Sequence, residues 1–171
     1  QGLRVSVREW SDRLKALAKD RDDGFHLQLR LRIGKKATPS FERRLKDYTL
    51  MTPGIVSRIL EIGSGPGGVP EVRELGHHLL AYLNDPKDAL PESVHGLFGC
   101  LDDAYLVARV YLRALELQGV PHESADQDDV YRERSREFVR MAMIVLPPEA
   151  GRTLERQARV VRELIQQKEI K

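Results

Sequence analysis

Two runs of apolar residues, on either side of a short connector, constrain the fold of this chain most. The first run lies between Gly68 and Leu83, and the second begins at Leu101 and reaches Leu115. In both, apolar residues recur three or four positions apart, which is the period of an amphipathic α-helix. Prolines, glycines and acids interrupt this pattern in the connector. The sequence therefore predicts a helical hairpin at the centre of the chain.

Helical spacing continues through most of the remaining sequence. It predicts helices over 6–20, 39–50, 53–63 and 130–146, and a last helix that begins at Pro147-Pro148 and passes Ile165. Thr38-Pro39 and Thr52-Pro53 are typical helix starts, because a side-chain oxygen caps the first turn and proline needs no partner there. We expect a mostly α, multi-helix bundle. We divide it into an N-terminal segment, 1–36, and a helical domain, 37–171, that contains the hairpin.

One stretch near the N-terminus has a different period. Apolar residues alternate with polar ones over 26–33, which is typical of a β-strand with one buried face. A strand needs a neighbour for its backbone hydrogen bonds, and Leu3, Val5 and Val7 offer a second alternating run. The sequence therefore predicts a small N-terminal pair of β-strands. If these two runs do not pair, another subunit or a partner protein is expected to add a strand.

A glycine-rich turn follows the helix predicted to end at Gly63. The sequence RILEIGSGPGG is similar to the first motif of S-adenosylmethionine-dependent methyltransferases, with Gly63, Gly65 and Gly68 at the glycine positions. That motif requires a strand before the turn and further strand–helix units after it. The residues after Leu101 are all helical in pattern, so a glycine linker between helices is the favoured interpretation. Methyl transfer is kept as an alternative.

The connector and its flanks carry a second motif. In this motif, Val69-Pro70 precedes the first helix and Tyr82 lies near its end. The motif residues that follow the first helix are, in order, Pro86, Asp88, Pro91, Glu92, Gly99, Asp102, Asp103 and Ala104. Over 69–115 the chain resembles the small bacterial helical domain called DUF1232, or YkvA-like. The resemblance implies a helical hairpin of unknown activity. Family members have an apolar connector, for which a membrane association has been suggested, whereas this connector is polar.

The acids of this motif have two interpretations. Asp88, Asp102 and Asp103 can cap helix starts, where carboxylates accept free backbone N–H bonds and the helix dipole favours negative charge. Alternatively, Asp88, Glu92, Asp102 and Asp103 form a divalent-metal site, since oxygen ligands suit Mg²⁺, Ca²⁺ or Mn²⁺. Capping is the favoured interpretation, and no other cofactor is expected.

Charge is unevenly distributed along the chain. Residues 1–47 carry 13 basic and 7 acidic side chains, residues 71–133 carry 5 and 13, and residues 134–171 carry 9 and 5. Such segregation often marks a surface for a partner or for nucleic acid, while charge on solvated helix faces is the simpler interpretation. The candidate surface residues are all basic: Arg30, Arg32, Lys35, Lys36, Arg43, Arg44, Arg152, Arg156 and Arg159.

These patterns favour an interaction protein over an enzyme. Hydrophobic residues make up 41% and charged residues 32% of the chain, and no run is apolar enough to span a membrane. Cys100 is the one cysteine, so an internal disulfide is excluded and a reducing cytoplasm is expected. We expect a non-catalytic, bacterial, cytoplasmic protein-interaction module, which binds a protein partner or itself. Nucleic-acid binding through the basic segments is the alternative.

Overall fold

The structure is a computed structural model that describes residues 2–19, 24–84, 96–119, 126–146 and 156. These residues form α1 (Gly2–Lys19), α2 (Phe25–Ile33), α3 (Pro39–Gly63), α4 (Pro70–Leu83), α6 (Leu101–Gln118) and α7 (Asp126–Val145). Two short 3₁₀ helices, η1 (Gly34–Lys36) and η2 (Gly96–Cys100), precede α3 and α6. The predicted helical bundle is confirmed. Residues 85–95 of the predicted connector lie outside the described residues, while 96–100 form η2. Of the predicted last helix, only Arg156 is described.

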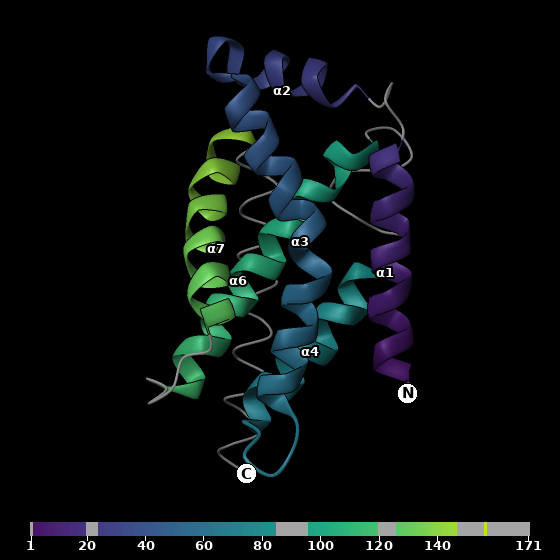
Figure 1. Ribbon diagram of the computed structural model, residues 1–171, viewed down its shortest axis with the longest axis vertical. Coiled ribbons are helices and arrows are strands. Elements are labelled where there is room, and N and C mark those ends of the chain that lie inside the picture. Colours follow the sequence, from purple (N-terminus) through teal and green to yellow (C-terminus); the bar gives the residue numbers. More distant parts are fainter. Residues whose placement is uncertain (1, 20–23, 85–95, 120–125, 147–155, 157–171) are drawn as a thin grey trace.

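Helix α3 is the centre of the bundle. It packs against α1, α4, α6 and α7, while α2 lies across one end (Figure 1). One hydrophobic core joins these helices, and its largest fully buried side chains include Trp10, Phe25, Phe98, Tyr111 and Phe138. The core therefore draws on both segments that we separated at residue 36. None of the described helices is both long enough and apolar enough to cross a membrane.

Helix α3 runs without interruption through Pro53, where two separate helices were predicted. Its start is as expected: the Thr38 hydroxyl accepts a hydrogen bond from the Phe41 N–H, and Pro39 is the first helical residue. Proline at 53 cannot donate to the Thr49 carbonyl. The Thr52 hydroxyl donates to that carbonyl instead, over 2.6 Å, and accepts a hydrogen bond from the Trp10 indole at 3.2 Å. A contact from α1 therefore supports the proline within α3.

The predicted pair of β-strands is wrong, since the described residues contain no strand. Residues 26–33 belong to α2, and Leu3, Val5 and Val7 belong to α1. In α2 the buried residues are Phe25 and Leu29, which are four positions apart, and the Phe25 ring packs edge-on against Phe98 at 5.5 Å. Leucine is among the residues with the highest helix propensity, and a helix satisfies its own backbone hydrogen bonds. An alternation made mostly of leucines, with Ile33 as the one β-branched residue of 26–33, therefore did not require a strand.

Candidate functional site

Helix α2 has an apolar face that the bundle does not cover. Phe25 and Leu29 are buried on one side, while Leu27 and Leu31 are 60% and 72% exposed. The two exposed leucines are four positions apart, so they lie one above the other on the outer side of the helix. A surface helix ordinarily has one apolar face and one polar face. An apolar face on each side is typical of a helix that also contacts another molecule.

Basic side chains surround these leucines. Together α2 and η1 carry four cations and no carboxylate, and all four cations are exposed. Arg30, Lys35 and Lys36 make no ion pair with the described residues, whereas Arg32 lies over the Phe98 ring at 5.4 Å. We call this set the α2 surface; it consists of Leu27, Arg30, Leu31, Arg32, Lys35 and Lys36. Sequence analysis found its cations but missed its leucines, which it assigned to a strand.

The other predicted basic residues differ in their surroundings. Arg43 and Arg44 are exposed in the first turns of α3, which follows η1. Arg44 is engaged, since its guanidinium donates to the Glu137 carboxylate at 3.0 Å. Arg156 is exposed and helical, while Arg152 and Arg159 lie outside the described residues. The structure thus brings together the N-terminal cations at one end of the bundle.

Two of the four predicted metal ligands are described. Asp102 and Asp103 are fully buried in the first turn of α6. The N-cap of α6 is Cys100, which makes no side-chain cap bond. The helix begins at Leu101, so the two aspartates are its second and third residues and neither is its N-cap. Negative carboxylates in this first turn are still stabilised by the positive end of the helix dipole. Asp88 and Glu92 lie outside the described residues, among which no three suitable side chains could hold a metal ion. The metal site stays a prediction.

The glycine-rich turn connects two helices. Helix α3, and not a strand, leads into Gly63, and Pro70 begins α4. A Cβ on Gly63 would lie 2.6 Å from the backbone nitrogen of Arg73, and the Arg73 Nε donates to the Gly63 carbonyl at 2.9 Å. Glycine at 63 therefore allows α3 and α4 to approach closely. Because the methyltransferase motif needs a strand at this place, the geometry lends that alternative no support.

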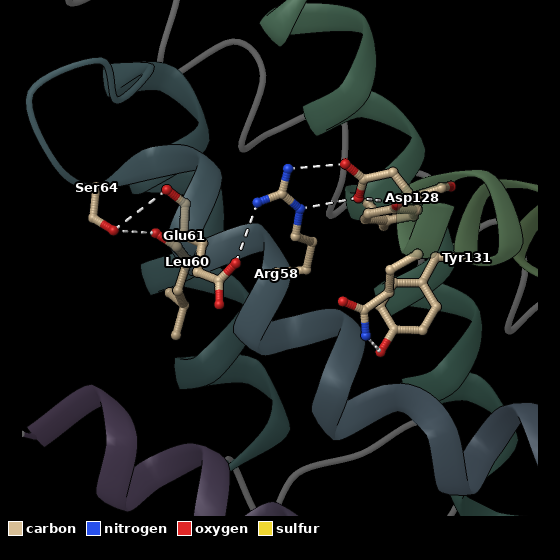
Figure 2. Close-up of polar contacts among 8 residues, drawn as sticks. Arg58, Leu60, Glu61, Ser64, Asp128 and Tyr131 are labelled. Carbon is tan, nitrogen blue, oxygen red and sulfur yellow. Dashed lines mark hydrogen bonds and ion pairs between the residues drawn. The ribbon is translucent and has the colours of Figure 1, made fainter. Parts of the chain in front are cut away.

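A cluster around Asp128, which sequence analysis did not single out, joins α3, α6 and α7. The Arg58 guanidinium donates to both Asp128 oxygens, at 2.9 and 2.8 Å, and to Glu61 at 3.2 Å (Figure 2). The Tyr111 hydroxyl donates to the same Asp128 carboxylate at 2.8 Å. These partners are 17 and 70 positions away from Asp128, so no local spacing signalled them.

The cluster shifts the acid–base equilibria of its members. Burial acts to raise the pKa of Asp128, but the hydrogen bonds from Arg58 and Tyr111 and the charge of Arg58 outweigh it and lower that pKa. The hydrogen bond to Asp128 raises the pKa of Arg58 further. Burial and the bond to Asp128 raise the pKa of the Tyr111 hydroxyl. All three groups therefore keep their ordinary charges near neutral pH, as in a structural ion pair.

A groove of about 790 Å³ opens between α1, α3 and α4. Its cations, Arg8, Lys15 and Arg73, lie along the same walls as the carboxylates of Asp12 and Glu61. This mixture selects neither an anion nor a cation, and Arg73 and Glu61 already have partners within the chain. The α2 surface, with one sign of charge and exposed leucines, is the better candidate site.

Comparison with protein-family models, with curated proteins and with solved structures finds no match to this chain. The resemblance of residues 69–115 to DUF1232 therefore stays a prediction.

Proposed function

We propose that this protein is a non-catalytic protein-interaction module that binds its partner through the α2 surface. The observation that carries the proposal is the exposure of Leu27 and Leu31 on a helix whose opposite side is fully buried. Two leucines on one short helix expose apolar area that a partner can remove from water. The surrounding cations would orient a partner of opposite charge and raise its association rate.

The shifted titratable groups fit a structural role. Arg58 and Tyr111 both donate hydrogen bonds to Asp128 from other helices. The Tyr48 hydroxyl contacts the Ser135 hydroxyl at 2.7 Å. Burial raises the pKa of Tyr48, which keeps that hydroxyl neutral. We infer a cytoplasmic setting from the sequence, since Cys100 is buried and has no second cysteine to pair with.

A library of peptides displayed on phage tests the proposal. Peptides selected on the intact chain are compared for binding to Leu27→Gln/Leu31→Gln and to Val130→Gln, since glutamine keeps helix propensity. Val130 is 50% exposed near the start of α7, at the end of the bundle away from α2 (Figure 1). We expect at least tenfold weaker binding to the double variant and unchanged binding to the control. Equal binding to all three chains, or no selected peptide, would overturn the proposal.

Nucleic-acid binding is the second candidate, because Arg30, Lys35, Lys36 and Arg43 gather at one end of the bundle without ion pairs among the described residues. Phosphates would neutralise such cations, and affinity would fall steeply with salt. A mobility shift at low salt, weakened in Arg30→Ala/Arg32→Ala, is the expected result. No shift at low salt ends this candidate. The exposed leucines favour a protein partner, since phosphate offers them no apolar contact.

A further inference from the structure

The chemistry of the α2 surface specifies what kind of partner fits it. We propose that the partner presents an amphipathic α-helix whose apolar stripe is flanked by carboxylates. This inference rests on the proposed function, and it adds the secondary structure and the charge of the bound segment. Three features of the surface carry it: the spacing of its leucines, the absence of a free strand edge, and the sign of its charge.

The spacing of Leu27 and Leu31 fits a helix in the partner. The two side chains form a ridge one helical turn long, with Arg30 three positions after Leu27 on the same side. A partner helix presents apolar residues at the same three- and four-residue intervals, so its side chains can pack on both sides of this ridge. The backbone N–H groups of α2 are engaged within the helix, and a strand would find no edge to extend.

The charge of the surface selects an acidic partner. The carboxylate that follows α2 and η1 in the chain is Glu42, and its oxygens contact His26 at 3.3 Å and Lys46 at 3.4 Å. Glu42 is therefore occupied, while Arg30, Lys35 and Lys36 make no ion pair with the described residues. Carboxylates beside the apolar stripe of a partner would meet these cations at the rim of the contact.

A second copy of the chain fits this surface poorly. In a symmetric dimer the same patch lies on both sides of the contact, so the cations of one α2 would face those of the other. Like charges opposite one another disfavour such a contact, and no carboxylate of α2 or η1 relieves the repulsion. The α2 surface is thus suited to a different protein whose charge is complementary.

Three synthetic 18-residue helical peptides test the inference by fluorescence anisotropy. They share one leucine stripe, and its flanking positions carry glutamate, glutamine or lysine. The intact chain is expected to bind the glutamate peptide about tenfold more tightly than the glutamine peptide in 50 mM salt, because three exposed ion pairs each contribute modestly. The preference should vanish in 500 mM salt. Lys35→Glu/Lys36→Glu leaves two cations and two carboxylates on this surface and should abolish the preference for the glutamate peptide. The matched reversal Arg8→Glu/Arg134→Glu should keep the original order.

The failures of the two proposals are distinguishable. If the glutamine peptide binds as tightly as the glutamate peptide, and Leu27→Gln/Leu31→Gln abolishes both, the acidic partner is rejected while binding through α2 stands. If none of the three peptides binds, the helical partner is rejected, and the phage selection decides separately whether α2 binds protein at all. Vesicles containing 30% phosphatidylserine and a 20-base-pair DNA duplex are compared in the same buffer. Tighter binding to either than to the glutamate peptide overturns the inference in favour of a membrane or nucleic acid.

Discussion

Replacing Asp128 by alanine is expected to lower the free energy of unfolding by about 3 kcal/mol. The Asp128 side chain is 2% exposed and accepts two hydrogen bonds from Arg58 and one from the Tyr111 hydroxyl. Removing one partner of a buried ion pair costs about 3–5 kcal/mol, because the other charge stays desolvated and unpaired. The Arg58 side chain is 24% exposed and regains part of its hydration, which places the cost at the lower end.

Thermal and urea unfolding, followed by circular dichroism at pH 7, measure this loss. For a chain of this length, about 3 kcal/mol lowers the Tm by roughly 6–12 °C. The neighbouring Asp129→Ala is the matched control, because the Asp129 side chain is 57% exposed and lies 3.3 Å from Arg132. Its substitution should change stability by less than about 1 kcal/mol. The reasoning is refuted if Asp128→Ala costs under about 1 kcal/mol, or if both variants lose equal stability.

Three further predictions concern contacts between helices. Because the folded pKa of Asp128 is lowered, its contribution to the free energy of unfolding is complete above about pH 4 and is lost in acid. The intact protein should therefore lose stability more steeply than Asp128→Asn when titrated from pH 5 downward. Parallel curves of stability against pH would contradict this. In urea unfolding, Gly63→Ala should lower the free energy of unfolding by about 1–3 kcal/mol, because its Cβ would contact α4. Gly67→Ala should change it by less than about 0.5 kcal/mol, since the space around Gly67 is open. Equal effects would contradict the close approach of α3 and α4. In the same assay, Thr52→Val should lower the free energy of unfolding by about 1–3 kcal/mol, since the Thr49 carbonyl and the Trp10 indole both lose a hydrogen-bond partner. An unchanged unfolding midpoint would show that Thr52 does not support Pro53.

The parts of the fold that were predictable depend on neighbouring residues. Thr38 and Pro39 mark the start of α3 because capping involves one turn of chain. Period-3.6 spacing marked the central helices, since a buried stripe of side chains is the direct cause of that spacing.

The parts that were not predictable depend on distant residues. Pro53 was read as a helix start, because the hydroxyl of Thr52 and the indole of Trp10, 42 positions away, could not be placed beside it. Asp128 lies just before the helix predicted over 130–146, and its partners come from α3 and α6. The basic residues of the candidate site were identified from composition, but their grouping with Leu27 and Leu31 required the helix.

Residues 25–33 show the division most clearly. The order of residues alone determined that apolar residues occupy every second position from Leu27 to Ile33, with one glutamine and two arginines between them and no acid. That pattern suits one face of a strand or two faces of a helix, and local spacing does not choose between them. The packing of Phe25 against Phe98, with Leu29 buried in the core, decided for the helix and turned Leu27 and Leu31 outward. The physical reason is that burial depends on what lies opposite a side chain, and Phe98, which lies opposite Phe25, is about 70 positions along the chain.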